Sequence, residues 1–371
     1  MAKAMTKRQR VERTMALQET DRVPIYDLLR CDAAFEHFGG QKLPPLADDE
    51  RTAETLMRIA GKAVDNMLDM TRSVGFGPVK AAERTDESGF VWQSSPHEKT
   101  TWIARRPFDD EAGAIKFLRQ WLQKVRGNTK ALANDPSGFR EAYHRRFLAT
   151  QAAIGETVNL LGQWGTGLDE VRVRLGIELF AYVQADQPAL ISEILEETTR
   201  YNVAVCHAVA ETRLSPAVLT YGDIACKGRL LHSPDYLRRE FFPRLKRLND
   251  AWHEHGFRCL FHSDGQLMEV MDDLIDAGID GLNPIETVAG MDLAEVKGTC
   301  GDKIFLAGGI DMSQLLSLGS PEEVREVCRD AIRTAYPGYF IGSTTEADNS
   351  CRLENLIAMF QVTRGLTPDK L

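Results

Sequence analysis

The segment Phe261–Gly265 carries two side chains that can do chemistry together, His262 and Asp264. It follows the apolar run Arg258–Phe261, which predicts a strand that ends at His262. Residues i and i+2 of a strand point to the same face, so the two side chains are expected to lie side by side. Such a pair can bind a metal ion, or the acid can orient the imidazole for proton transfer. The alternative is a core histidine held by a carbonyl group, with Asp264 capping the next helix.

Other polar side chains also fall where predicted strands end, and most of them are acids. Besides His262 and Asp264, this set comprises Trp164, Asp223, Glu286, Asp311 and Glu346. Converging carboxylates repel one another, so some of them must be protonated or paired with a cation or a metal ion.

Three further features have simple structural alternatives. Asp223 and Lys227 flank a loop bounded by glycines, where a salt bridge that fixes the loop is the alternative to substrate contact. Cys351 precedes the last predicted helix, and we interpret it as a buried thiol rather than a metal ligand. His253 and His255 stand two residues apart on a predicted helix, where side chains do not face each other. We interpret both histidines as surface residues.

The elements that must position these residues follow a regular order from about residue 155. Short apolar runs bounded by turns alternate with helical stretches, which predicts six parallel βαβ units. With one or two earlier units they fit a closed (β/α)8 barrel, whose active site lies at the C-terminal ends of the strands. A doubly wound open sheet is the alternative, but the chain has no glycine-rich nucleotide loop of the dinucleotide-binding or Walker A type.

Residues 1–150 have a different character, mainly helical and rich in charge. One extended stretch, Val79–Trp92, predicts a hairpin that turns at Glu87–Gly89. We therefore expect an N-terminal helical and hairpin extension. Because barrels of this length form one unit, we expect residues 1–371 to be a single domain.

Composition restricts the class of partner and the compartment. The 371 residues include 45 Lys and Arg against 54 Asp and Glu, a net charge of -9. This balance disfavours nucleic acid and a polybasic membrane anchor, since both need a basic patch. No apolar run approaches the roughly 20 residues that cross a bilayer, and no hydrophobic segment follows the basic N-terminus to form a secretory signal. The seven cysteines are scattered without a Cys-x-x-Cys pair, which suits a reducing cytoplasm.

Nine segments in a fixed order extend over nearly the whole chain: Met5–Arg10, Asp21–Pro24, Gly222–Ala225, Ser233–Asp235, Phe242–Lys246, His262–Gly265, Asp292–Val296, Gly308–Asp311 and Leu353–Met359. Together they resemble the uroporphyrinogen decarboxylase superfamily. The resemblance implies a (β/α)8 barrel without a bound prosthetic group.

The superfamily has two chemistries, and the resemblance is closer to one of them. True decarboxylases hold a porphyrinogen with an aspartate and an arginine-rich segment, Arg-Gln-Ala-Gly-Arg, near the N-terminus. This chain lacks that segment, and Tyr26–Arg30 stands about where it belongs. Decarboxylation of four acetates is hard to support without the clamp. The other branch comprises methyltransferases that work with a corrinoid protein.

In the methyltransferase branch a zinc ion binds a thiolate or polarises a methyl donor. Thiol-methylating members carry His-x-Cys and a later cysteine as zinc ligands. His262 matches the histidine, but Asp264 replaces the first cysteine, and the later one falls near Thr345–Glu346 rather than at Cys351. Such oxygen-rich ligands still suit zinc. They fit a substrate whose methyl group is bound to oxygen or nitrogen better than they fit a thiol.

The sequence therefore predicts an enzyme that moves a methyl group between a small O- or N-methylated substrate and a corrinoid protein. The corrinoid is expected on a separate chain, because the Asp-x-His-x-x-Gly signature of cobalamin binding does not occur. The residues predicted to be catalytic are Asp223, His262 and Asp264, those predicted to bind substrate are Trp164, Lys227 and Asp311, and the candidate metal ligands are His262, Asp264, Glu286 and Glu346.

Two other functions stay open at this point. A decarboxylase acting on uroporphyrinogen or a related acid predicts a basic cleft with several arginines at the barrel mouth. A non-catalytic barrel that acts as a binding partner predicts that the polar groups at the strand ends do not converge.

Overall fold

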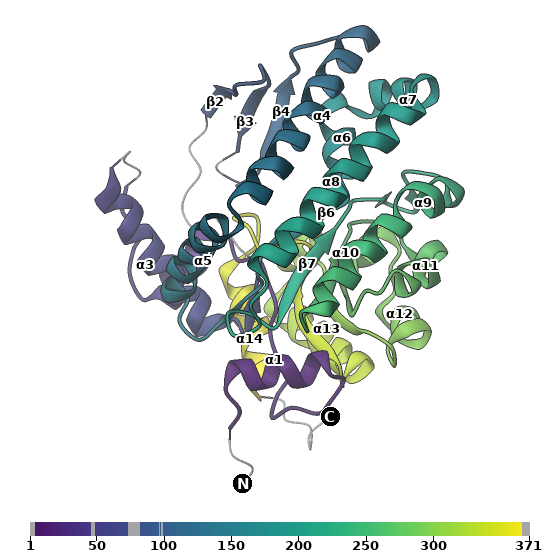
Figure 1. Cartoon of the computed structure of the whole chain (residues 1–371). Helices are drawn as coiled ribbons and strands as arrows, with labels where there is room; N and C mark the ends of the chain where they lie inside the picture. The colour runs from purple at the N-terminus through teal and green to yellow at the C-terminus, as the bar shows by residue number, and fades with distance from the viewer. Residues whose placement is uncertain (1–3, 46–48, 73–81, 96, 98, 366–371) are drawn as a thin grey trace.

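A parallel sheet surrounded by helices forms the centre of the molecule (Figure 1). The computed structural model describes residues 4–45, 49–72, 82–95, 97 and 99–365. Six strands are neighbours in the order in which they follow along the chain, and each adjacent pair is parallel. These strands are β6 (Gln163–Gly165), β7 (Ala217–Tyr221), β10 (Arg258–His262), β11 (Gly281–Asn283), β12 (Phe305–Ile310) and β13 (Tyr339–Ser343).

The N-terminal part of the chain closes this sheet into a barrel. Strand β5 (Val158–Asn159) leads directly into β6 and pairs in parallel with β1 (Met70–Thr71). Ile25 and Tyr26 then bridge β1 on one side and Ile341 of β13 on the other. With β5 and β6 counted as one strand and Ile25–Tyr26 as another, the described residues form a closed ring of eight parallel strands. The predicted (β/α)8 barrel is thereby confirmed.

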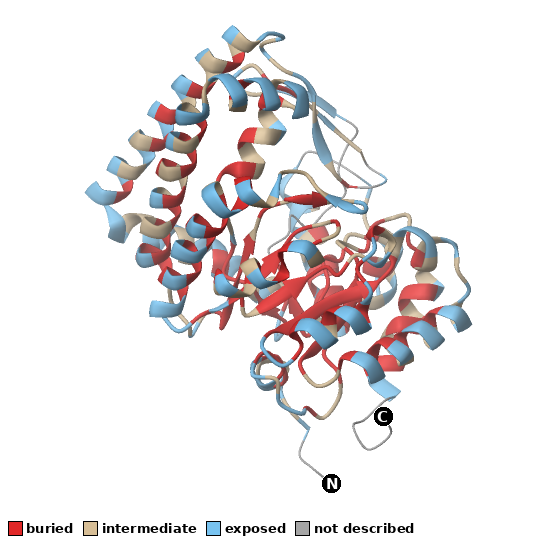
Figure 2. Cartoon of the chain, turned by 90° about the vertical axis from the view of Figure 1, so that its right-hand side faces the viewer, coloured by how far each residue is buried: buried red, intermediate tan, exposed pale blue. Residues whose placement is uncertain are grey.

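Helices cover the outside of the barrel, with their buried sides toward the strands and their exposed sides outward (Figure 2). The helices that alternate with the strands from β6 onward are α6 (Leu168–Leu175), α7 (Ile177–Asp186), α8 (Pro188–Val209), α9 (Pro234–Glu240), α10 (Phe242–Glu254), α11 (Met271–Asp276), α12 (Leu293–Cys300), α13 (Pro321–Ala335) and α14 (Leu353–Gly365). Met268–Val270 and Thr287–Ala289 form short 3₁₀ helices, and Met312–Leu316 forms a π-helical turn.

The N-terminal extension is helical with a small antiparallel sheet, as predicted. Its helices are α1 (Lys7–Met15), α2 (Asp32–Gly39), α3 (Glu50–Met67), α4 (Glu111–Asn134) and α5 (Pro136–Ala153). The strands are β2 (Ala82–Thr85), β3 (Val91–Ser94) and β4 (Thr101–Arg105), in that order in the sheet. The turn between β2 and β3 closes where Gly89 N–H donates to Asp86 O at 3.0 Å, which confirms the hairpin. The first residues of the predicted stretch, 79–81, lie outside the described residues.

The chain from Ser233 to His255 forms two consecutive helices. Ser233 caps α9, since its hydroxyl accepts the N–H of Tyr236 at 3.2 Å. The helix then breaks at Phe241, and α10 begins with Pro243 in its first turn. Proline has no N–H to donate to the preceding turn, so the chain starts a new helix there. A second antiparallel pair, β8 (Ala225–Cys226) and β9 (Arg229–Leu230), precedes this region.

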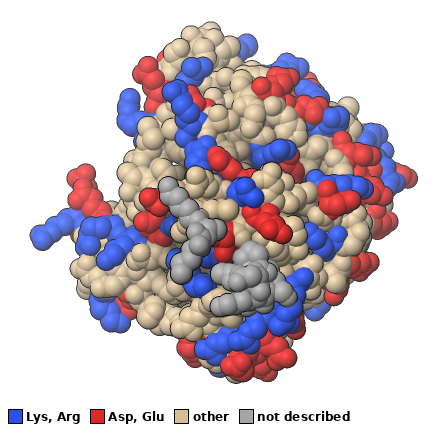
Figure 3. Space-filling model, turned by 90° about the horizontal axis from the view of Figure 1, so that it is seen from below, with Lys and Arg blue, Asp and Glu red and all other residues tan. Residues whose placement is uncertain are grey.

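Helix α1 lies across the N-terminal end of the barrel, at the bottom of Figure 1. Its residues Val11 and Met15 belong to the same buried cluster as Leu219 and Leu260 of the barrel strands. Charged side chains of both signs are interspersed over the face that is seen from below (Figure 3). Among the helices that the structure describes, none is long and apolar enough to cross a membrane.

A buried carboxylate ties the N-terminal helix to the strand that closes the barrel. Asp69 is fully buried, and its oxygens accept hydrogen bonds from Arg10 at 2.7 Å and from Arg22 at 2.8 Å. It also accepts the backbone N–H of Ile25 at 2.9 Å. Arg10, which its position on a charged helix would place on a solvated face, is therefore buried beside Asp69.

We expect the substitution Asp69→Asn to lower the free energy of unfolding by about 3–5 kcal/mol, because Arg22 loses its buried counter-charge and Arg10 keeps only its pair with Asp21. Urea denaturation would measure the loss. The matched control is Asp250→Asn, which removes an exposed partner of Lys246 and should cost about 0.5 kcal/mol or less. Equal losses in the two variants would contradict the role given to Asp69.

Candidate active site

The strand register brings the predicted site residues to one rim of the barrel. His262, the last residue of β10, lies beside Tyr221 at the end of β7 and beside Asn283 at the end of β11. Asp223 and Asp264 follow their strands by two residues each. The C-terminal ends of these parallel strands therefore form a common polar edge, where barrel enzymes have their active sites.

Asn283 fixes the orientation of the His262 ring. The ring atom Nδ1 lies 2.7 Å from Oδ1 of Asn283. The side-chain nitrogen of Asn283 donates to the carbonyl of Ala307 at 3.1 Å, so its oxygen is the atom that faces the ring. An amide oxygen can only accept, and Nδ1 must therefore carry the proton. This leaves Nε2 of His262 with a free lone pair.

Two carboxylates lie close to this side of the ring. Nε2 of His262 lies 3.8 Å from Oδ1 of Asp264, and the backbone N–H of Asp264 donates to Asp223 at 3.3 Å. One ligand atom from each of Asp223, His262 and Asp264 lies within 4.8 Å of the others. A lone pair facing carboxylates is favourable only when a proton or a cation lies between them. One nitrogen and two oxygens form a donor set that zinc accepts.

The protonation of His262 follows from its surroundings. Burial lowers its pKa, and the guanidinium of Arg72 lowers it further, whereas Asp264 and Asp223 oppose both effects. The neutral imidazole is the form that can bind a metal ion or accept a proton. The barrel mouth therefore favours the reactive form of the ring.

Thr345 contacts the same acid from the loop after β13. Its hydroxyl donates to Oδ1 of Asp264 at 2.8 Å, and its carbonyl accepts from Arg72 at 3.2 Å. The backbone of Thr345 has φ of 74°, a left-handed conformation that β-branched residues seldom adopt. Such strain persists where the surrounding structure over-determines it, and it is concentrated at functional sites.

Two predicted metal ligands border this group without being part of it. Glu286 accepts the N–H of Gly265 at 2.8 Å, and burial raises its pKa, with a further increase from the charge of Asp264. Glu346 forms an ion pair with Arg30 at 3.1 Å, and burial raises its pKa as well. The third residue grouped with His262 and Asp264 is Asp223, and a metal-ligand role of the two glutamates stays a prediction.

The three residues predicted to bind substrate lie outside this group. The ring of Trp164 packs in the helix layer, with its centre 5.9 Å from that of Tyr143 and 6.0 Å from that of Trp252. Lys227 is exposed at the tip of the β8–β9 hairpin. Both carboxylate oxygens of Asp311 accept backbone N–H groups of the turn that it caps. The sequence marks where a strand ends, but not to which side each following side chain turns.

Sequence reasoning missed a second network next to Asp223. Tyr221 donates its hydroxyl to Glu170 at 2.6 Å, and Asp169 forms an ion pair with Arg172. Burial raises the pKa of Asp169 to about 6, and the charge of Asp223 contributes to the increase. These acids stand in the first turn of α6, where acidic residues are ordinary, so no local signal separates them from a helix start.

Comparisons with known proteins agree with this fold. A family model described as "Uroporphyrinogen decarboxylase (URO-D)" matches residues 150–366, more than half of the chain. No curated protein sequence matches the chain. Among solved structures, a methyltransferase from Methanosarcina mazei is similar with a TM-score of 0.65 and 15% sequence identity. The similarity covers 97% of this chain and 99% of that one.

The arrangement around His262 predicts two shifts of opposite sign. In protein treated with a chelator, we expect Arg72→Gln to raise the pKa of His262 and Asp264→Asn to lower it. The guanidinium disfavours the imidazolium and the carboxylate favours it. An NMR titration of the histidine rings would measure both shifts. Arg333→Gln, an exposed partner of Asp330 on α13, is the control and should leave the pKa unchanged. Shifts of the same sign would show that these groups do not face the ring.

Proposed function

Because the chain belongs to the uroporphyrinogen decarboxylase (URO-D) family, we propose that it is a methyltransferase-like enzyme of that family. It moves a methyl group between a small O- or N-methylated substrate and a corrinoid held by a separate protein. The observation that carries the proposal is the barrel rim, where Nε2 of His262 faces the carboxylates of Asp264 and Asp223. The similar fold of a methyltransferase supports it.

The donor atoms of this site fit a zinc ion. His262, Asp264 and Asp223 would hold it, and Asn283 would keep the ring of His262 aimed by its bond to Nδ1. When bound, the ion would supply Lewis-acid assistance to the oxygen or nitrogen that loses the methyl group. Glu286 and Glu346 remain candidates for a ligand position only if they leave their present partners, Gly265 and Arg30.

The protein's own groups can manage the proton that methyl transfer requires. As the bond between the methyl carbon and oxygen or nitrogen breaks, its electron pair stays with the heteroatom and the methyl group passes to the corrinoid. The heteroatom then needs a proton. Glu286 is placed to supply it, because its carboxyl group lies at the rim and burial raises the pKa of that group. Asp223 and Asp264 are close enough to raise that pKa further.

We also infer that residues 1–371 act as one catalytic unit. Ile25 and β1 from the N-terminal part complete the ring that the later strands begin. Arg72, which follows β1, contacts Thr345 at the rim. The corrinoid belongs to a partner in this proposal, since the chain carries no Asp-x-His-x-x-Gly signature.

The central test is methyl transfer to free cob(I)alamin, followed by its absorbance, with an aryl methyl ether, a methylamine and a methyl thioether as donors. We expect transfer from the ether or the amine, and loss of activity after treatment with a chelator. The substitution His262→Ala should lower kcat/KM by at least about 100-fold, and Asn283→Ala by about 10–100-fold, as losses of a ligand and of its supporting group do.

His253→Ala is the matched control for this assay, because His253 binds Asp280 near the other end of β10 and should leave methyl transfer unchanged. Metal analysis of the purified protein accompanies the assay. A protein that holds no zinc and keeps full activity after chelation would overturn the metal part of the proposal. Transfer from the thioether alone would overturn the proposed class of substrate.

Decarboxylation of uroporphyrinogen is expected to be absent. The arginines near the rim are already engaged within the described part of the chain: Arg30 with Glu346, Arg172 with Asp169, and Arg72 with the carbonyl of Thr345. Two of these three guanidinium groups already have a carboxylate partner, whereas several propionates need paired guanidinium groups that are free to bind them. Chromatography of the porphyrins after incubation would measure the product. Formation of porphyrins with fewer carboxylates would favour the decarboxylase instead.

A further inference from the structure

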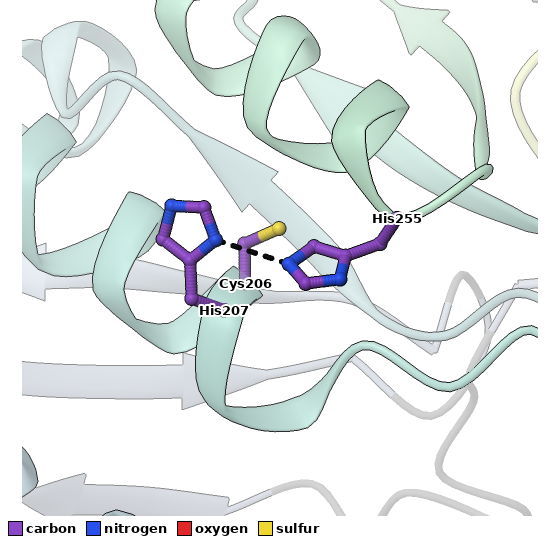
Figure 4. A group of neighbouring side chains, drawn as sticks. All are labelled: Cys206, His207 and His255. Atoms are coloured by element: carbon purple, nitrogen blue, oxygen red, sulfur yellow. Dashed lines mark hydrogen bonds between the residues drawn. The ribbon is translucent and has the colours of Figure 1, made fainter.

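A second group of metal-ligating side chains lies near the start of β10, at the opposite end from His262. Cys206 and His207 belong to the last turn of α8, and His255 is the residue that ends α10 (Figure 4). Strand β10 begins just after this group and ends at His262. At the usual rise of a strand, about 13 Å of β10 separates the two groups.

The three side chains converge from two neighbouring helices (Figure 4). Nδ1 of His207 lies 3.0 Å from Nε2 of His255, and one ligand atom from each of the three residues lies within 4.8 Å of the others. In tetrahedral zinc sites, bond lengths of about 2.0–2.3 Å place two ligand atoms about 3.3–3.6 Å apart. Small side-chain movements would therefore bring the present arrangement to that geometry.

We propose that Cys206, His207 and His255 bind a zinc ion, with water as the fourth ligand. Thiolate and imidazole together are a donor set that suits zinc. Both histidines are exposed, so the ion and the water can enter from solvent. The Sγ–H bond of Cys206 breaks as the Sγ–zinc bond forms, and its proton leaves to solvent. One of the two hydrogen-bonded nitrogens, Nδ1 of His207 or Nε2 of His255, now carries a proton. When that nitrogen binds zinc, its proton moves to the other nitrogen of the same ring.

A neighbouring group of similar composition is a weaker candidate because its atoms are already used. His253 binds Asp280 at 2.7 Å, and Asp280 also accepts from Arg258 at 2.6 Å and from the N–H of Cys259 at 2.8 Å. By contrast, Sγ of Cys206 has no hydrogen-bond partner among the described residues. The sequence suggested comparing His255 with His253, whereas the fold places His255 against His207 of the adjacent helix.

The site would fasten the ends of two helices that pack on the barrel. Cys206 is buried, and burial raises the pKa of its thiol, so zinc binding must include the cost of ionising it. Affinity should therefore fall as the pH is lowered, with protons released on binding. This role does not depend on the chemistry at the barrel mouth.

The test separates the two ends of β10. In the double variant His262→Ala/Asp264→Ala, which lacks the mouth ligands, we expect one zinc ion per chain by metal analysis. With Co²⁺ in place of zinc, the absorption band of a thiolate bound to cobalt should appear. The substitutions His255→Ala and His207→Ala should each weaken metal binding by about 100-fold and abolish that band. His253→Ala, two residues from His255, is the matched control and should retain both.

Thermal unfolding provides a second readout that does not require activity. In the His262→Ala/Asp264→Ala background, zinc should raise the Tm of the chain and of its His253→Ala derivative, but not that of its His255→Ala derivative, while the three metal-free proteins should melt alike. If the double variant fails to fold, the same comparison in the wild-type background applies, with one ion fewer in His255→Ala. Loss of the zinc ion in His253→Ala would overturn the proposal. Binding of the metal ion without a cobalt–thiolate band would overturn it as well.

Discussion

The barrel is closed by a short strand in which Ile25 bridges β13 and Tyr26 bridges β1, and the polar rim depends on that closure. Its main-chain hydrogen bonds join it to β13 and β1, and buried carboxylates reinforce it at both ends. Asp69 accepts the N–H of Ile25 at 2.9 Å near the start of the strand. Asp27, just after the strand, accepts the backbone N–H of Ser343 at 2.9 Å. Burying a carboxylate without hydrogen-bond partners is costly. The hydrogen bonds that Asp69 and Asp27 accept therefore also hold the closing strand in the barrel.

A closed ring forces all the strands to end at one rim, and this concentrates charge. Asp223, Asp264 and Glu286 are far apart in the sequence, yet they are close enough for the first two to raise the pKa of the third. Arg72 supplies positive charge from the strand that the N-terminal part contributes. The rim is therefore a place where acids converge around one neutral histidine, and it favours a proton or a cation at its centre.

The fold could be predicted because each strand and helix carries its own apolar pattern and turn residues. The pair His262 and Asp264 could also be predicted, since both belong to one strand end. The sequence could not predict that the side chain of Trp164 points outward to the helices, because a strand of three residues has too little pattern to show which residues face the barrel interior. The sequence also could not predict the hydrogen bond between Asn283 and His262 or the one between Thr345 and Asp264. Each of these bonds depends on the register between separate strands. The features of the site that the sequence predicts lie within one short segment. The features that it does not predict depend on how separate strands and helices pack together.

Asp264 and Thr345 connect the sequence resemblance to the geometry. By that resemblance they stand at or next to the positions where thiol-methylating members of the superfamily carry cysteines. In this chain the two side chains form a hydrogen bond of 2.8 Å beside His262. A hydroxyl that donates to a carboxylate is stable without a metal ion, whereas two thiolates at that distance would repel each other. Oxygen donors also suit harder, more Lewis-acidic chemistry than sulfur donors do. In the function that we propose, this exchange of sulfur for oxygen favours a substrate that releases an alcohol or an amine over one that presents a thiol.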